Sequence, residues 1–348
     1  MGSIEAQYET IVDNISKADW EHYGSEFADY SIYQTWAYQE NRAEMDNQEI
    51  SRVVVKDENG NVVTMCQVRI KYIKPLRLKI GYVQWGPLVR GLDGCFRCTG
   101  EALNILQRTY VGTRVNVLRI VPNVCDNERG DEFAKLLEAS GFYRVPSAKP
   151  YHTMLLSLNS SGGLLRKSLH QSWRRKLKKS EAVGIETKAR TDDESLTILA
   201  RLYLDLVRRK GFKGLDPQQF IRTQRDLPME EKMTVILAYY NNEPVSAHLT
   251  SYQGDTAIML LAASTERGLA CEASYLTWWK SIVASNRRGK QKYDVGGIDF
   301  EKNPTVSRFK TGVGGEEVSY IGAFDACSSM RARVIWQASE KIYNLVKR

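Results

Sequence analysis

The sequence predicts an α/β (α+β) protein built from two domains. Its 348 residues match the length of two average domains or of one large one. Hydrophobic residues make up 43% and charged residues 26% of the chain, as in folded globular proteins and unlike disordered or fibrous ones. A succession of hairpin, strand, helix and strand also occurs in each half of the chain, which indicates two copies of one fold.

The first half opens with a helical pattern and continues into a hairpin. Apolar residues between Ile4 and Ile15 recur at helical spacing, so we expect an opening helix. Two apolar runs, at 51–57 and 62–72, flank Asn59-Gly60, a pair that supplies the positive φ values of a tight turn. The later elements predicted for this half are a strand ending at Gly86-Pro87, a helix near 99–111, a strand at 115–121 and a helix near 130–140.

The same order recurs from about residue 232. The predicted elements are a strand at 233–240, a turn at 241–244, strands at 245–252 and 256–263, a helix at 272–288 and a strand at 292–298. This unit is similar to the GNAT acyltransferase core, so the sequence predicts two GNAT-like acyltransferase domains packed side by side. We expect the first domain at 1–150, completed by a C-terminal helix at 325–348, and the second at 151–324.

A basic amphipathic helix is predicted at 163–183, between the two copies. Its apolar residues recur every four positions and so share one face, which we expect to be buried; they are Leu165, Leu169, Trp173 and Leu177. Its basic residues are Arg166, Lys167, Arg174, Arg175, Lys176, Lys178 and Lys179. They nearly account for the formal net charge of +8, and such a surface favours a polyanionic partner such as RNA. An ordinary solvated helix face is the alternative interpretation.

No cofactor and no metal site is predicted. The histidines are scattered and belong to no HExxH motif; they are His22, His152, His170 and His248. Cys95 and Cys98 form a lone CxxC without the second pair that a zinc site needs, so we expect reduced, structural thiols. Residues 264–270 occupy the place of a coenzyme A pyrophosphate loop, but their glycine spacing is wrong for it.

The chain is expected to act in the cytoplasm without stable membrane insertion. No apolar run approaches the roughly 18 residues of a membrane-spanning helix. The polar, acidic N-terminus is also unlike a signal peptide.

Three C-terminal segments carry a resemblance to a known family. They are Tyr293-Asp294-Val295-Gly296-Gly297-Ile298, the run from Ser307 to Gly315 (SRFKTGVGG), and the run from Tyr320 to Asp325 (YIGAFD). These segments resemble the YDFGGI, RFKxGFGG and YIGxFD motifs of the Fem-type (FemA/FemB/FemX-like) aminoacyltransferases. Further matches are Gln34-Thr35-Trp36, Gly86-Pro87, Trp173, Arg209-Lys210-Gly211-Phe212 and Ala263-Ser264. The second half has no long heptad insertion, so we expect no coiled-coil arm.

The resemblance implies an aminoacyl-tRNA-dependent, amide-forming transferase. Fem-type enzymes are tandem GNAT proteins that move amino acids from aminoacyl-tRNA onto peptidoglycan precursors. A neutral amine attacks the ester of the charged tRNA, and negative charge builds up on the carbonyl oxygen. By resemblance, Lys310 would stabilise this oxyanion, a role in which one well-placed donor contributes about 3–4 kcal/mol. Phe309 would form the channel wall beside it.

Other site residues are implied at the acceptor. Arg209 matches an arginine that binds phosphate of the nucleotide-linked acceptor, a role that suits its forked donors. The remaining expected substrate-binding residues are Arg42, Trp36, Met259 and Ser264. The sequence departs from the family at Met259, where members carry Tyr, and at Val121-Pro122, where they carry Asp before Pro. A small peptide-like or nucleotide-linked acceptor is therefore expected, but its identity is left open.

Two alternative functions are compatible with the sequence. One is an acyl-CoA-dependent N-acyltransferase of the same fold, and the other is a non-catalytic RNA-binding relative. The sequence does not reveal which amino acid is carried, which amine receives it, or the oligomeric state.

Overall fold

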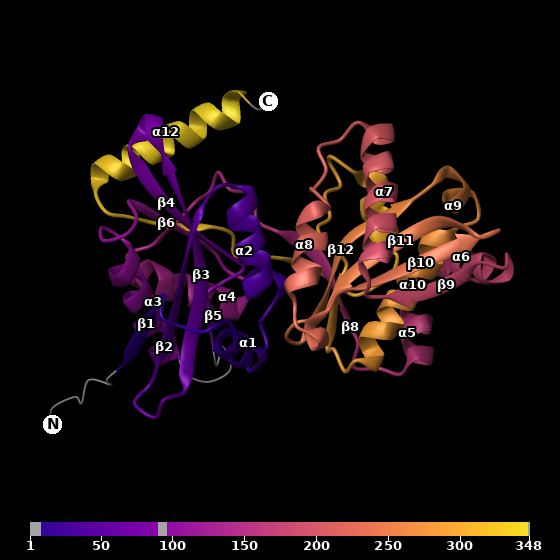
Figure 1. Ribbon diagram of the computed structural model, residues 1–348, viewed down its shortest axis with the longest axis horizontal. Helices are drawn as coiled ribbons and strands as arrows, with labels where there is room; N and C mark the ends of the chain where they lie inside the picture. Colours follow the sequence, from indigo (N-terminus) through magenta and orange to yellow (C-terminus); the bar gives the residue numbers. More distant parts are fainter. Residues whose placement is uncertain (1–7, 90–95, 347–348) are drawn as a thin grey trace. The chain divides into compact units, whose positions relative to one another are not determined.

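The computed structural model describes residues 8–89 and 96–346 (Figure 1). The chain forms two compact units: Met1–Tyr151 together with Ser319–Arg348, and His152–Val318. The chain thus enters the second unit at His152 and leaves it at Val318, whereas the sequence analysis placed these boundaries at 151 and 324. None of the described helices is both long enough and apolar enough to cross a lipid bilayer.

The first unit is a mixed sheet with helices on both faces. Its strands are β1 (Glu9–Val12), β2 (Glu49–Lys56), β3 (Val62–Ile73), β4 (Leu78–Gln84), β5 (Leu88–Val89), β6 (Val117–Val121), β7 (Tyr143–Arg144) and β15 (Phe324–Cys327). Its helices are α1 (Lys17–Ser25), α2 (Trp36–Met45), α3 (Phe96–Tyr110), α4 (Glu128–Ala139) and α12 (Met330–Val346), with short 3-10 helices at Ile32–Gln34 and Lys74–Leu76. The sheet order is β1-β2-β3-β4-β6-β15-β7, and β5 pairs with β3.

The predicted opening helix is wrong over the residues that the structure describes. Residues Glu9–Val12 form strand β1, which pairs antiparallel with β2. Ile11 and Val12 pack into different core clusters, as successive side chains of a strand do. The first helix begins only at Lys17, where the Ser16 side chain accepts a hydrogen bond from the Asp19 amide. Ile4 lies outside the described residues.

The two faces of the first sheet have separate cores. On one face, α3 and α4 pack their apolar residues, including Leu103 and Phe133, against the sheet. On the other face, Trp20 of α1 packs against β2 and β3, while Ala332 of α12 packs against β4 and β6. In Figure 1, the C-terminal α12 (yellow) crosses the purple strands β4 and β6.

The second unit has a sheet of the same design. Its strands are β8 (His152–Ser157), β9 (Glu186–Arg190), β10 (Thr234–Tyr240), β11 (Glu243–Ser251), β12 (Thr256–Ser264), β13 (Lys292–Asp294) and β14 (Glu316–Ser319). Its helices are α5 (Gly162–Ser168), α6 (Gln171–Ala182), α7 (Asp193–Lys210), α8 (Gln218–Asp226), α9 (Glu266–Ala270), α10 (Ala273–Arg287) and α11 (Pro304–Thr311), with a 3-10 helix at Met229–Glu231. The sheet order is β14-β8-β13-β12-β11-β10-β9.

The strand orders confirm the repeat that the sequence predicted. In each sheet, four antiparallel strands end in a parallel pair, which is β4 with β6 in the first unit and β12 with β13 in the second. The next strand in each sheet follows the other repeat in the sequence. Strand β15, which follows the second repeat, pairs with β6 of the first sheet, and β8, which follows the first repeat, pairs with β13 of the second sheet. The C-terminal segment therefore completes the first sheet with a strand, β15, before helix α12 begins.

The predicted basic helix at 163–183 is interrupted. It forms two helices, α5 and α6, because the backbone at Leu169 is extended (φ −59°, ψ 144°). The Arg174 guanidinium donates hydrogen bonds to the carbonyl oxygens of Lys167 and Leu169, which satisfies the exposed end of α5. The predicted apolar face is nevertheless buried in the core of the second unit; it comprises Leu165, Leu169, Trp173 and Leu177.

Candidate functional site

The parallel pair β12 and β13 separates part of the way along the second sheet. The pairing runs only from Thr256 to Ile258, although β12 continues to Ser264. The register between β11 and β12 shifts at the same place and leaves Leu260 without a partner on β11. Such a bulge bends and twists its strand. The corresponding strands β4 and β6 of the first unit stay paired through Gln84 and Val121, so this splay is a feature of the second unit.

Lys310 lies at this splay. It belongs to the last turn of α11, is only 7% exposed, and its Nζ donates a 2.8 Å hydrogen bond to the Gly297 carbonyl. Gly296 has a φ of 75°, and a Cβ there would lie 3.2 Å from the Lys310 Nζ and from the Met259 carbonyl oxygen. A glycine at 296 therefore provides both the left-handed backbone and the space that the lysine occupies.

A buried carboxylate organises the loop beneath Lys310. Asp294, at the end of β13, is fully buried and accepts hydrogen bonds from the Thr153 hydroxyl (2.5 Å) and the Gly296 amide (2.8 Å). Burial lowers the pKa of Lys310 to about 8, and the Asp294 charge opposes that shift. Lys310 is thus mostly protonated at neutral pH, and only one of its three donors is engaged within the described residues. An ammonium of this kind can stabilise a developing oxyanion.

Aromatic side chains surround the helix that carries Lys310. The ring of Phe309 lies 6.0 Å from that of Trp173, 4.9 Å from Tyr275 and 5.1 Å from Trp278. The Trp173 indole donates a hydrogen bond to the Phe309 carbonyl (3.2 Å), and the His170 amide donates to the Gly312 carbonyl (3.0 Å). The start of α6 therefore holds the C-terminal end of α11.

His248 is a structural histidine in this unit. It is fully buried, and its Nε2 lies 2.7 Å from the Tyr293 hydroxyl. Burial, and secondarily the Lys310 ammonium, lowers the pKa of His248 to about 3, so it is neutral at physiological pH. A histidine with this pKa is a poor general base near pH 7. His170, by contrast, is exposed before α6.

Arg209 and Ser264 lie together at the far end of β12. The Arg209 guanidinium donates a 2.8 Å hydrogen bond to the Ser264 carbonyl and lies 3.8 Å from a Glu266 carboxylate oxygen. The Ser264 hydroxyl is engaged with the hydroxyls of Ser246 and Ser274. At the usual rise along a strand, Ser264 is roughly 15 Å from Met259, so this pair and Lys310 lie toward opposite ends of the splay.

Arg42 and Trp36 belong to α2 of the first unit, and both are engaged there. Arg42 forms a salt bridge with Asp46 (2.8 Å). The Arg52 guanidinium lies 3.2 Å from the centroid of the Trp36 ring, so it covers one face of that ring. The contact with Arg52 thus gives Trp36 a structural role within the first unit, which the sequence alone did not suggest.

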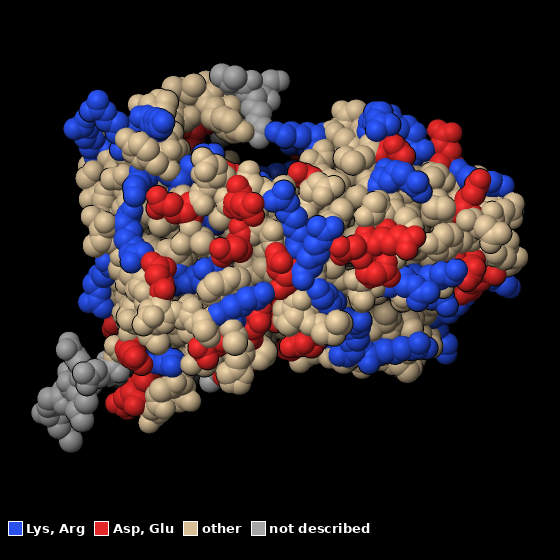
Figure 2. All heavy atoms as spheres, in the orientation of Figure 1, with Lys and Arg blue, Asp and Glu red and all other residues tan. Residues whose placement is uncertain are grey.

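The basic residues of α5 and α6 fall into two groups. Three are engaged: Arg166 pairs with Glu181, Arg174 caps α5, and Lys176 lies 3.6 Å from a Glu272 carboxylate oxygen. The others are exposed and form no salt bridge with any residue that the structure describes; they are Lys167, Arg175, Lys178 and Lys179. On the face drawn in Figure 2, Lys and Arg side chains gather over the region where Figure 1 places α5.

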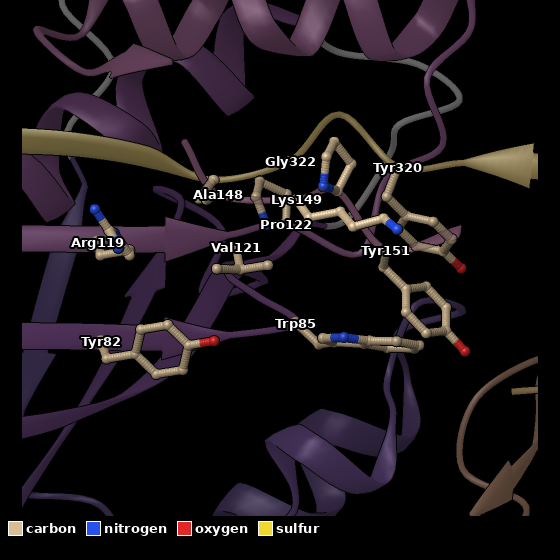
Figure 3. Close-up of a pocket in the computed structure, with 12 residues that line it drawn as sticks. Tyr82, Trp85, Arg119, Val121, Pro122, Ala148, Lys149, Tyr151, Tyr320 and Gly322 are labelled. Carbon is tan, nitrogen blue, oxygen red and sulfur yellow. The ribbon is translucent and has the colours of Figure 1, made fainter. Parts of the chain in front are cut away.

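The first unit contains a pocket of about 200 Å³ (Figure 3). Its lining residues are Tyr82, Trp85, Arg119, Val121, Pro122, Ala148, Lys149, Pro150, Tyr151, Tyr320, Gly322 and Ala323. The rings of Trp85, Tyr151 and Tyr320 are in mutual contact at one end, with centroids 5.2–5.6 Å apart, and Tyr82 and Arg119 lie at the other end.

Sequence reasoning missed this pocket because its residues come from four separate segments and share no spacing. Val121, which stands where the resembled family carries Asp, and the following Pro122 nevertheless lie in its wall. The role of Asp294 was also missed, although its position inside a recognised motif was a usable signal. Within 8–89 and 96–346, no three His, Cys, Asp or Glu side chains are grouped to hold a metal ion. Cys95 lies outside the described residues.

Comparisons with known proteins agree with this architecture. The sequence model of the FemAB family matches residues 228–335. No curated protein matches the chain. The crystal structure of FemX is similar with a TM-score of 0.80 at 16% sequence identity, covering 98% of this chain and 100% of that chain.

Two more distant structures share the fold. A conserved protein of unknown function from Bacteroides thetaiotaomicron has a TM-score of 0.59 at 10% identity, covering 92% of this chain and 99% of its own. The structure of L-PGS from Bacillus licheniformis has a TM-score of 0.52 at 12% identity, covering 92% and 95%. The family match includes the splayed strands and Lys310, and the likeness to FemX extends over nearly the whole chain. Together they show a match to the FemAB family over residues 228–335 and a Fem-type, tandem GNAT fold over nearly the whole chain.

Proposed function

We propose that this protein is an aminoacyltransferase that acts in the cytoplasm. It transfers an amino acid from aminoacyl-tRNA to an amine of a peptidoglycan precursor or a related peptide-like acceptor. The observation that carries this proposal is the buried Lys310 ammonium at the splay of β12 and β13, with two donors left for a ligand. The FemAB match over residues 228–335 supports the same reaction class.

The reaction follows from the chemistry of an ester and an amine. The neutral amine attacks the ester carbonyl carbon, a C–N bond forms, and the carbonyl oxygen becomes an oxyanion. Lys310 donates hydrogen bonds to this oxyanion and lowers the barrier. The C–O bond to the tRNA ribose then breaks, and the proton lost by the amine balances the one gained by the ribose hydroxyl. No covalent enzyme intermediate and no cofactor is required.

An acyl-CoA donor is the second candidate, and the local structure of α9 weakens it. The Gly268 amide, which a pyrophosphate would need, donates to the Thr265 hydroxyl instead (3.0 Å). A Cβ on Gly268 would lie 2.1 Å from the Val245 carbonyl oxygen, so packing alone explains this glycine. The splay itself is compatible with either donor.

One experiment separates the candidates. The protein is incubated with a charged tRNA pool and candidate acceptor amines, with and without RNase treatment of the pool, and in parallel with acyl-CoA. We expect amide formation that requires intact tRNA and is lost in Lys310→Met. Transfer from acyl-CoA, or transfer that survives RNase, would refute the donor assignment. Tight tRNA binding without any transfer would favour the non-catalytic RNA-binding alternative.

A further inference from the structure

Helix α12 has an apolar stripe on the face that points away from the first sheet. The stripe consists of four side chains that are 58–71% exposed: Met330, Val334, Ile342 and Leu345. At roughly 100° per residue, these positions fall within about 120° of the helix circumference. Single exposed apolar residues are normal on a protein surface, whereas contiguous apolar patches mark interaction sites.

The inner side of α12 fixes how the helix is rotated on the sheet. Ala332 is buried against β4 and β6. The Trp336 indole donates a 2.9 Å hydrogen bond to the Asp325 carboxylate. One turn later, Glu340 accepts a 2.8 Å hydrogen bond from the Arg119 guanidinium. Trp336 and Glu340 are four residues apart and share one side of the helix, so the apolar stripe is held on the outer side.

Two cations lie in the same arc as the apolar stripe. Arg331 and Lys341 are both exposed. The only acidic residue between Met330 and Val346 is Glu340, which is already bound to Arg119. Long Lys and Arg side chains can extend their charge beyond neighbouring apolar groups, so both kinds of group can contact one partner. The outer face of α12 is therefore both apolar and positively charged.

The turn between β3 and β4 adds further positive charge beside the helix. Leu76 in this turn packs into the same core cluster as Ala332 and Trp336 of α12. The sequence from Lys71 to Lys79 contains no Asp or Glu. The basic turn is defined here by three exposed residues: Lys71, Lys74 and Arg77. Figure 2 shows Lys and Arg side chains near the region where Figure 1 places this turn and the start of α12.

We propose that the outer face of α12 and the basic turn bind peripherally to the surface of an anionic lipid bilayer. The helix lies in the plane of the surface, with the apolar stripe at the boundary between headgroups and acyl chains. The cations contact the lipid phosphates, to which a negative surface potential attracts them. This inference goes beyond the proposed function and does not depend on it, because it involves neither Lys310 nor the basic residues of α6.

Two other partners fit the chemistry of this face less well. A second copy of the chain would bring Arg331 and Lys341 against the same cations, and such like-charge contacts oppose association. A standard dimer interface also takes about 20–30 residues from each partner, far more than the outer face of α12 presents. RNA would engage the cations through its phosphates but would leave the apolar stripe without a partner.

Vesicle flotation of the whole chain tests the proposal. Vesicles of phosphatidylcholine alone are compared with vesicles that also contain about one third phosphatidylglycerol, an anionic lipid. We expect the wild type to bind the anionic vesicles at least about tenfold more tightly than the neutral ones, and to be released as the salt concentration rises. A wild type that does not bind anionic vesicles, or that binds both kinds equally, would overturn the proposal.

Substitutions distinguish the contribution of the apolar stripe from that of the charge. The triple variant Val334→Gln, Ile342→Gln and Leu345→Gln should bind about 100-fold more weakly, because less apolar area enters the bilayer. The double variant Arg331→Gln and Lys341→Gln should bind about 25-fold more weakly, since each cation near an anionic surface contributes a factor of about five. An apolar triple variant that binds like the wild type would reduce the contact to charge alone and overturn the proposal.

A matched control uses comparably exposed apolar residues of the second unit. Replacing Leu204, Leu215 and Met229 by Gln should leave vesicle binding at the wild-type level. An equal loss of binding in this control would show that any exposed apolar residue contributes, and the assignment to α12 would fail. If the α12 triple variant does not fold, the single substitution Leu345→Gln decides. Leu345 is 71% exposed, and its replacement should weaken binding about tenfold.

Sedimentation equilibrium without lipid distinguishes the bilayer from a second copy of the chain. We expect the wild type and the α12 triple variant to have the same mass. A wild-type dimer that the triple variant fails to form would show that a second copy covers the apolar stripe, and it would overturn the lipid assignment. A triple variant that loses tRNA binding but keeps vesicle binding would likewise overturn it in favour of RNA.

Discussion

Lys310 has two properties that a catalytic cation needs, and each has a local cause. Burial among the aromatic residues of the second unit removes water that would screen its charge. The hydrogen bond to the Gly297 carbonyl fixes the direction of the ammonium. The positive φ of Gly296 and its missing side chain make this geometry accessible. A surface lysine would hold the same charge, but it would be mobile and strongly hydrated.

The depressed pKa of Lys310 predicts a pH dependence of transfer. Burial lowers the pKa to about 8, so the ammonium persists below pH 8 and is lost as the pH rises through that value. The acceptor amine must be neutral, which favours higher pH, so kcat/KM should follow a bell-shaped curve with its descending limb near pH 8.

Two variants test whether Lys310 is the group that titrates in the descending limb. In Lys310→Arg, the cation keeps its proton, so the descending limb should disappear even if activity is lower. Lys310→Met should lose about 100- to 1,000-fold in kcat, the usual effect of removing one oxyanion donor. A limb near pH 8 that survives in Lys310→Arg would show that another group titrates.

At the scale of elements, α6 connects the exposed basic side chains to Lys310, the lysine that we propose to be catalytic. The indole of Trp173 donates to the Phe309 carbonyl at the end of α11, while Arg175, Lys178 and Lys179 on the same helix are exposed. A partner that binds the exposed face of α6 therefore binds the helix that positions Lys310.

The variant Trp173→Phe should distinguish a role of Trp173 in positioning Lys310 from a role in binding the substrates. The substitution removes the 3.2 Å hydrogen bond to Phe309 and retains an aromatic ring beside Tyr275. We expect kcat to fall about three- to tenfold, in line with one hydrogen bond, with KM nearly unchanged. Trp279→Phe, in the same core, is the control and should leave kcat unaffected. Equal losses in both variants would indicate a general effect on the core.

The exposed cations of α6 should determine the salt dependence of tRNA binding. Arg175, Lys178 and Lys179 lie three and four residues apart and so share one helix face. Replacing all three by Gln should reduce the slope of log Kd against log salt by about two to three units, because fewer counterions are released. The triple variant of Lys71, Lys74 and Arg77, exposed in the first unit, should retain the wild-type slope. An equal reduction of the slope in both triple variants would mean that tRNA binds to the basic surface without preference for α6.

At the scale of the whole molecule, the sequence predicted what depends on local pattern and missed what depends on long-range pairing. The hairpin at Asn59-Gly60 was predictable because its turn chemistry is local, and Gly60 has a φ of 79°. The strand at Glu9–Val12 was not predictable from the sequence. Its apolar spacing also fits a helix, and only the pairing with β2 makes it a strand. Lys310 was found through a motif, whereas the pocket of the first unit is lined by four separate segments and belongs to no motif. Such a pocket can be recognised only once the strands are in register.

Strand β15 follows the second repeat in the sequence but pairs in the first sheet. The folding of the first unit therefore depends on the end of the chain. Strand β15 lies between β6 and β7, and Phe324 on it is fully buried in the main core of that unit. Asp325 and Glu340 also neutralise Arg119. A chain that ends at Gly322 would lose the internal strand β15 and leave the largely buried Arg119 without either carboxylate, which is strongly destabilising.

We therefore expect a chain ending at Gly322 to lose the first unit and keep the second. Hydrogen exchange followed by mass spectrometry should show full loss of protection in β4 and β6, with β11 and β12 still protected, because the second unit has its own core. A chain ending at Ser328 retains β15 and loses only α12, so it should keep β6 protected while exposing the apolar side chains of Leu78 and Val117. Co-expression of residues 319–348 as a separate peptide should restore protection in β6. Protection of β6 in the chain ending at Gly322 would show that the first repeat folds by itself, and the exchanged strand would then be an addition to the sheet rather than a requirement for it.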